Sequence, residues 1–138
     1  MAVLKLLVAD RTSLAAELLA LWDSGAGPCL LEFYTGAILA GPATAITTQV
    51  KLGTLTCSDP LGTASAGALT FGAITQDAAA DNSGDATWAR LVDGNGVARA
   101  VIDVTGLAGN GACKLNTVTI YAGGPIQVSS CVLTFGGA

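Results

Sequence analysis

Residues 86–104, with the sequence ATWARLVDGNGVARAVIDV, decide the fold class of this chain. Two runs rich in Val, Ile, Thr and Trp flank the four-residue stretch Asp93-Gly94-Asn95-Gly96. Gly, Asn and Asp accept the backbone conformations that a tight turn requires, and the flanking residues favour extended structure. The stretch therefore predicts a β-hairpin with strands over 86–92 and 97–104.

Short strand-like runs continue on both sides of this hairpin. Turn-forming residues separate them every 8–15 residues or so, a spacing typical of all-β sandwiches and barrels. No strand–helix–strand alternation occurs, so a parallel sheet is not expected. The runs cover residues 30–34, 50–57, 68–74, 117–121 and 126–135, and a long loop is expected at 38–48.

These patterns predict a mainly β protein. We expect an antiparallel β-sandwich, jelly-roll or immunoglobulin-like, of seven or eight strands with one N-terminal α-helix. The residues expected in the core are Leu18, Trp22, Phe33, Leu55, Trp88, Val101, Ile120 and Val132.

The N-terminal segment has a different period from the rest of the chain. Four large apolar residues recur at i, i+4, i+7 and i+8, which predicts an amphipathic helix over about 11–23. A Gly- and Pro-containing stretch at 24–28 would end it. The four residues are Leu14, Leu18, Leu21 and Trp22, and we expect them to face the sheet or a neighbouring subunit; the candidate N-caps are Asp10, Thr12 and Ser13.

Ahead of this helix, residues 3–8 form an apolar run that predicts a strand-like arm. Such an arm can add a strand to a neighbour's sheet edge. We therefore divide the single domain into an arm and helix over 1–28 and a β-sandwich over 29–138. The candidate interaction residues of the arm are Val3, Leu4, Leu6, Leu7 and Val8.

The composition argues against several function classes. Only 12% of the 138 residues are charged, the net charge is −4 and there is no histidine. Histidine is the commonest general base and metal ligand, so we expect no enzyme and no cofactor. Six scattered cations do not favour nucleic-acid binding, and no run reaches the ~18–20 apolar residues that cross a membrane. An N-terminal export signal is not expected either, because Lys5 interrupts the apolar run.

The four cysteines lie at positions 29, 57, 113 and 131, without a CxxC pair. Without an export signal, we expect four reduced and buried thiols. Two disulfides, in one of three connectivities, are the alternative.

Two local clusters have both a functional and a structural interpretation. Asp81, Ser83 and Asp85 have the alternate spacing of calcium ligands, but a solvated acidic loop is the favoured interpretation. Trp88 and Arg90 share one strand face and suggest a stacking platform for a sugar or peptide. We favour Trp88 in the core with the Arg90 head at the rim.

The order of several motifs along the chain resembles a family of small virion structural proteins of tailed bacteriophages and prophages. The resemblance runs from about residue 12 to the end, and it implies a structural role without catalytic residues. The stretches are Gly25-Ala26-Gly27-Pro28, Leu31-Glu32-Phe33-Tyr34-Thr35-Gly36, residues 52–60 (LGTLTCSDP), Ala64-Ser65-Ala66-Gly67, residues 84–96 (GDATWARLVDGNG), Leu115-Asn116-Thr117 and Gly124-Pro125-Ile126-Gln127-Val128.

The resemblance and the apolar composition together favour a capsid decoration, or cement, protein that binds between capsid subunits. Its partners would be the major capsid protein or other virion proteins, with no nucleic acid and no membrane. We also expect a homo-oligomer, and a place in the virion after assembly in the host bacterial cytoplasm. A tail or neck component (tube, adaptor or tip) is the alternative, followed by a receptor- or carbohydrate-binding sandwich.

Overall fold

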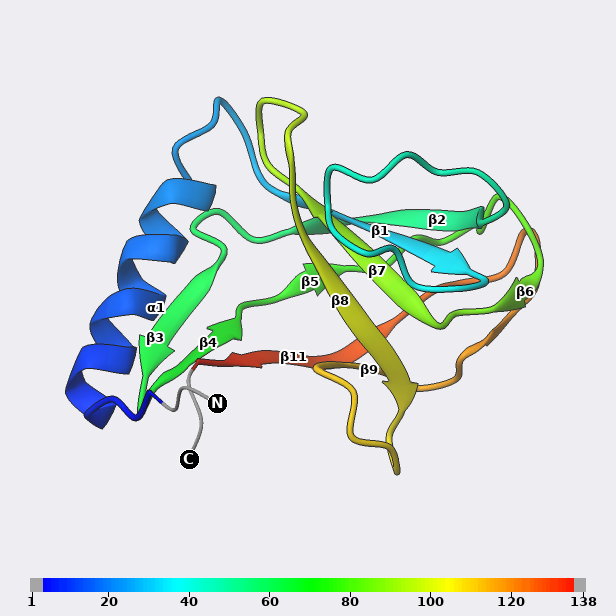
Figure 1. Cartoon of the computed structure of the whole chain (residues 1–138). Coiled ribbons are helices and arrows are strands. Elements are labelled where there is room, and N and C mark those ends of the chain that lie inside the picture. The colour runs from blue at the N-terminus through cyan, green and yellow to red at the C-terminus, as the bar shows by residue number, and fades with distance from the viewer. Residues whose placement is uncertain (1–3, 136–138) are drawn as a thin grey trace.

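The computed structural model describes residues 4–135. One helix precedes eleven strands, most of them short (Figure 1). Their bounds are α1 Val8–Trp22, β1 Leu30–Thr35, β2 Val50–Cys57, β3 Gly62–Ser65, β4 Ala68–Phe71, β5 Ile74–Thr75, β6 Gly84–Asp85, β7 Trp88–Val92, β8 Ala98–Gly106, β9 Cys113–Leu115, β10 Thr119–Ile120 and β11 Val128–Thr134.

Nine of the strands form one curled sheet in the order β3-β4-β11-β9-β8-β7-β1-β2-β5, while β6 and β10 pair separately. The mainly β class with one helix is confirmed. A sandwich of two sheets is not what the chain forms, because the large sheet curls into a half-barrel. The β8–β9 pair is parallel, so the sheet is mixed, and the expectation of a purely antiparallel sheet is wrong.

Irregular pairing explains the curl. The register shifts at Phe33/Tyr34 between β1 and β2, at Leu91/Val92 between β7 and β8, and at Val128/Ser130 between β11 and β9. An extra residue in one strand bends it and increases the local twist. Three such sites, spread over the sheet, bend it so that one of its faces is concave and encloses the core.

Most of the expected core residues belong to the main core cluster, which lies against this concave face. Phe33 and Leu55 are fully buried there, and Trp22 and Ile120 nearly so. Leu18 is partly buried against the same cluster. Val132 is 37% exposed, and its expected place in the core is wrong. Side chains alternate along a strand, and the buried Cys131 takes the inner position, so Val132 points outward.

A second, smaller apolar cluster lies on the opposite face of the sheet. It contains Tyr34, Leu39 and the fully buried Trp88, with Ile46 and Val101 packed against it. Leu39 and Ile46 come from the loop between β1 and β2, which therefore covers this face. Trp88 is in a core as expected, but not in the main one.

The hairpin at Asp93-Gly94-Asn95-Gly96 is confirmed, since β7 and β8 pair across it. Asp93 is buried, and its Oδ1 accepts the N–H groups of Asn95 and Val97 at 2.9 and 3.0 Å. Its Oδ2 lies 2.7 Å from Nε of Arg99. These donors lower the pKa of Asp93, the Val97 amide first.

The helix begins earlier than predicted. Leu7 is its N-cap and has no side-chain capping bond. All three expected caps instead lie inside the helix: Asp10 is in its first turn, and Thr12 and Ser13 donate to the carbonyls of Val8 and Ala9 at 2.9 and 3.1 Å. A hydroxyl that bonds to the carbonyl four residues earlier is compatible with a helix interior.

Candidate interaction surface

Helix α1 stands at one end of the molecule, alongside β3 and β4 (Figure 1). Its inner face consists of Ala15, which is fully buried, Trp22 at 4% exposed, and the partly buried Leu18 and Leu19. Two polar contacts fix its position. Oγ1 of Thr12 accepts the N–H of Gly67 at 2.8 Å, and the carboxylate of Asp23 accepts the N–H of Leu61 at 3.0 and 3.1 Å. The helix is thus held at both ends by backbone groups of the β3–β4 hairpin region.

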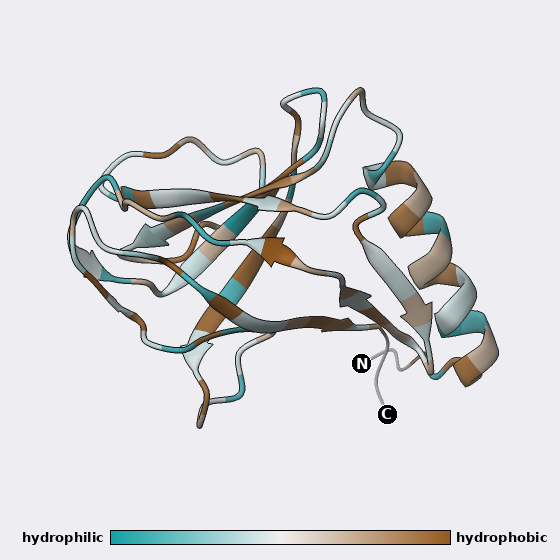
Figure 2. Ribbon diagram, turned by 180° about the vertical axis from the view of Figure 1, so that it is seen from behind, coloured by the Kyte–Doolittle hydropathy of each residue, from teal (hydrophilic) through white to brown (hydrophobic). Residues whose placement is uncertain are grey.

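The flank of the helix that borders this inner face carries apolar side chains that remain half or more exposed. Leu7, Leu14 and Leu21 are 73%, 52% and 50% exposed. Residues seven apart lie almost above one another on a helix, so the three form one row about 21 Å long. We call Leu7, Leu14 and Leu21 the outer row. Figure 2 shows hydrophobic segments recurring along the length of the helix.

The sequence placed Leu14, Leu18, Leu21 and Trp22 on one face, and the structure separates them. Leu18 and Trp22 pack inward, whereas Leu14 and Leu21 remain half exposed. The signal for this split was Ala15, whose small side chain completes the inner face with Leu18 and Trp22 at i, i+3 and i+7. A small residue on the inner face lets the helix approach the strands closely.

The expected arm is placed differently from the prediction. Leu4 to Leu7 form no strand, and Val8 is already helical. Leu4 is 76% exposed and precedes the outer row, Val8 is 50% exposed just after Leu7, and Leu6 is half-buried. Val3 lies outside the described residues.

Two acidic residues accompany the outer row. Asp10 and Glu17 are exposed and, like the leucines, lie seven residues apart. On a helical projection they form a second row on the solvent side of the first. An apolar strip with one acidic edge results.

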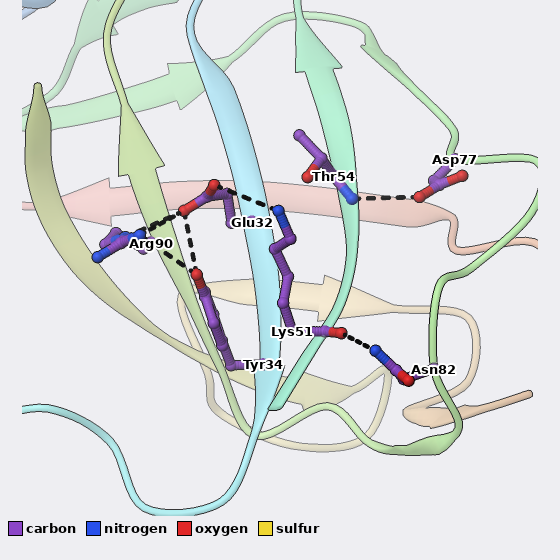
Figure 3. A network of polar contacts seen from close by, with 7 residues as sticks. All are labelled: Glu32, Tyr34, Lys51, Thr54, Asp77, Asn82 and Arg90. Atoms are coloured by element: carbon purple, nitrogen blue, oxygen red, sulfur yellow. Dashed lines mark hydrogen bonds and ion pairs between the residues drawn. The ribbon is translucent and has the colours of Figure 1, made fainter. Parts of the chain in front are cut away.

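The polar cluster on the outer face of the sheet is a closed network (Figure 3). Glu32 accepts from Nε of Arg90 at 3.0 Å, and its second oxygen lies 3.9 Å from Nζ of Lys51. The Tyr34 hydroxyl donates to Glu32 at 3.2 Å and accepts from Arg90 at 3.3 Å. The Tyr34 ring stacks on Trp88 with centroids 4.4 Å apart.

This arrangement leaves no ring face open to a ligand. Trp88 is fully buried and Tyr34 is 4% exposed. The Arg90 guanidinium lies 5.7 Å from the Tyr34 ring centre, as a cation–π neighbour within the chain. Burial is the main reason why the pKa of Tyr34 is raised. The two rings and the ion pair therefore fasten β1 to β7 and do not offer a stacking platform.

The acidic loop is fastened to β2. Asp77 accepts the N–H groups of Thr54 at 3.1 Å and Ala79 at 3.0 Å, and Asn82 donates to the carbonyl of Lys51 at 2.9 Å (Figure 3). Asp85 lies in β6 and pairs with β10. Between residues 4 and 135, no three His, Cys, Asp or Glu side chains gather in a way that could hold a metal ion.

The four cysteines are buried and carry free thiols, as expected for the reduced state. Burial raises the pKa of Cys29 to about 11 and that of Cys57 to about 12. Thiolates are the nucleophilic form of cysteine, and such values keep these side chains protonated at neutral pH.

Within the described part of the chain, no helix is long and apolar enough to cross a membrane. Comparison with protein-family models, with curated proteins and with solved structures gives no match to this chain. The resemblance to virion proteins and the role it implies stay predictions.

Proposed function

We propose that this chain is a non-enzymatic structural protein of a tailed-bacteriophage virion, a decoration protein that binds between subunits of the head. It would use the outer row of α1 as its contact surface and join the particle in the host cytoplasm. The observation that carries the proposal is the exposed row of Leu7, Leu14 and Leu21 on a helix whose neighbouring face packs against the sheet. Exposed apolar patches of this kind mark sites of protein contact.

The energy available from the outer row can be estimated from exposure. Full burial of a leucine side chain is worth about 2 kcal/mol. Leu14 and Leu21, each about half exposed, would contribute about 1 kcal/mol apiece, and Leu7 about 1.5 kcal/mol. This total offsets only part of the loss of translational and rotational freedom on binding. A partner must therefore add contacts beside the row, as a site between two capsid subunits does.

The acidic edge defines the chemistry of that partner. Asp10 and Glu17 favour lysines or arginines along one side of the groove that receives the row. A second copy of this chain has few cations to offer, because it contains six Lys and Arg in all, and Arg90 and Arg99 are already paired within the chain. We therefore propose that a different virion protein occupies the row. The homo-oligomer expected from the sequence would use other surfaces.

The other two function classes have less support. A tail or neck component would use the same apolar strip, and no described feature favours it over the head. A carbohydrate- or receptor-binding role would need a platform of open aromatic rings, but Trp88 and Tyr34 are buried and Tyr121 is a single exposed ring.

Co-sedimentation with head shells assembled without this chain tests the proposal. We expect wild-type protein to pellet with the shells, and Leu7→Asp and Leu14→Asp to stay in the supernatant. Leu107→Asp is the matched control, because Leu107 is 59% exposed but lies in the turn after β8. Glu17→Lys should weaken binding most at low salt, where surface charges are least screened.

Two results would overturn parts of the proposal. Equal binding by Leu14→Asp and Leu107→Asp would remove the outer row from the contact. Wild-type protein that binds tails and leaves shells free would remove the head placement.

A further inference from the structure

The four buried cysteines form two cross-strand pairs. Cys113 in β9 lies directly opposite Cys131 in β11. Cys29 precedes β1 and Cys57 ends β2, and the Cys57 N–H donates to the Cys29 carbonyl at 2.9 Å. All four side chains belong to the main core cluster. The two pairs share burial and cross-strand placement but differ in their position on the hydrogen-bond ladder.

Cys113 and Cys131 occupy a non-hydrogen-bonded position. The N–H of Val132 donates to the carbonyl of Ala112 at 3.0 Å, so residues 132 and 112 are a hydrogen-bonded pair. Hydrogen-bonded and non-hydrogen-bonded pairs alternate along an antiparallel ladder, so the neighbouring residues 131 and 113 are a non-hydrogen-bonded pair. In such pairs the Cα atoms are about 4.5 Å apart and the side chains approach each other more closely than at hydrogen-bonded positions. A disulfide needs Cα atoms at about 4.4–6.8 Å and Cβ atoms at about 3.5–4.5 Å. The ladder therefore places this pair close to disulfide geometry.

Cys29 and Cys57 occupy the other kind of position. Their backbones share a ladder hydrogen bond, where opposite Cα atoms are about 5.5 Å apart and side chains diverge. The Cys29 thiol also donates to the Trp22 carbonyl at 3.4 Å. The Cys113 and Cys131 side chains, in contrast, lie directly opposite each other on the same face of the ladder. The ladder thus brings the Cys113 and Cys131 side chains together, whereas the Cys29 thiol is directed to a backbone carbonyl.

The Cys113–Cys131 pair also lies in a short ladder that joins two parts of the sheet. In the strand order, β3, β4 and β11 connect to the remaining strands through the β11–β9 ladder. Strand β9 has only three residues, and the ladder contains a register shift at Val128/Ser130. Helix α1 packs on β3 and β4, so this ladder links the helix-bearing part to the rest of the sheet.

We propose that Cys113 and Cys131 are a selective disulfide pair, which a low-molecular-weight disulfide such as oxidised glutathione converts into a staple across β9 and β11. One cysteine thiolate attacks the glutathione disulfide, forms a mixed disulfide and releases one glutathione thiol. The second cysteine then attacks the protein sulfur of that mixed disulfide and releases the second glutathione. The two cysteine sulfurs lose two electrons and two protons in total, and one glutathione disulfide is reduced to two thiols.

The reaction requires that glutathione reach the two cysteines. Cys113 is fully buried and Cys131 is 2% exposed, so glutathione cannot reach them in the closed sheet. The neighbouring Cys113 thiol and burial both raise the pKa of Cys131, which slows attack in the folded state. The staple therefore forms while β11 is docking during folding, or when the β9–β11 ladder opens locally.

Tryptic mapping after refolding tests this proposal directly. The full chain is refolded from urea in reduced and oxidised glutathione, alkylated, and digested without reduction. Cleavage after the six Lys and Arg residues puts each cysteine in its own peptide, 12–51, 52–90, 100–114 and 115–138. We expect a linked species of peptides 100–114 and 115–138, with Cys29 and Cys57 alkylated.

Two double variants test whether the disulfide stabilises the connection between β9 and β11. In Cys29→Ala/Cys57→Ala, the oxidised protein should unfold at a higher urea concentration than the reduced protein. In Cys113→Ala/Cys131→Ala, the oxidant should leave the unfolding midpoint unchanged. Four alkylated cysteines at every glutathione ratio, or a link that involves Cys29 or Cys57, would overturn the proposal. It is independent of the proposed virion role.

Discussion

Two neighbouring helix residues, Leu14 and Ala15, should differ widely in how much the same charged substitution destabilises the fold. Leu14 is 52% exposed in the outer row, whereas Ala15 is fully buried against the sheet. In Leu14→Asp, the lower helix propensity costs about 0.5 kcal/mol and the loss of half a leucine's burial about 1 kcal/mol. We therefore expect about 1.5 kcal/mol of destabilisation and a folded protein.

In Ala15→Asp, a larger and ionisable side chain enters the packed helix–sheet contact. An unpaired buried carboxylate costs several kcal/mol, and the added volume costs about 1–3 kcal/mol more. Domains of this size have about 5–15 kcal/mol of stability in total, so this variant should be mostly unfolded or severely weakened.

Urea unfolding, followed by the fluorescence of Trp22 and Trp88, measures both variants. Shell binding without urea then distinguishes a folding defect from an assembly defect, since Leu14→Asp should fold and fail to bind. Equal destabilisation by Leu14→Asp and Ala15→Asp would refute the orientation of the helix. A folded Leu14→Asp that binds shells as wild type does would refute the role of the outer row.

Three further predictions concern the sheet and its loops. A double-mutant cycle with Trp88→Leu and Tyr34→Leu should give a coupling energy of about 0.5–1.5 kcal/mol in urea unfolding, because the rings stack; additive effects would contradict the stacking. The pKa of Asp93 is lowered in the fold, so its contribution is present above the carboxyl's unfolded pKa of about 4 and is lost as the pH falls through the folded value. Asp93→Asn should therefore be less sensitive than wild type to acid below about pH 4, in thermal melts at falling pH; an unchanged acid dependence would contradict this assignment. Gly53→Ala would place a methyl group against the Asp77 carboxylate, so it should cost about 1–3 kcal/mol and speed proteolysis of the 76–83 loop; unchanged protection would show that the loop does not depend on this contact.

The strands that sequence could predict are those with strong local patterns. The 93–96 turn and the alternating run at 50–57 gave β7, β8 and β2 close to their observed bounds. The β3 strand was missed, because Gly62–Ser65 consists of small residues without alternation and pairs only once β4 is beside it. Strand β9 is three residues long and obtains its parallel partner β8 from the tertiary fold. Local propensity indicates neither the pairing of β3 with β4 nor that of β9 with β8.

The curling of the sheet into a half-barrel could not be predicted from the sequence for a similar reason. Alternation indicates that a strand has two faces but not whether a second sheet or a curled continuation covers one of them. The same limit applies to Val132, whose outward direction depends on which face Cys131 occupies. For the interaction surface, the helix and the apolar N-terminus were predictable. The split of its leucines into inner and outer sets depended on the packing of Ala15.

The position of this chain in a reconstructed phage particle tests the central claim most directly. We predict density for the half-barrel at many equivalent sites on the head, with Leu7, Leu14 and Leu21 covered by another virion protein that presents basic residues beside Asp10 and Glu17. Particles that lack the chain, or a bound chain whose α1 outer row faces solvent, would contradict the account.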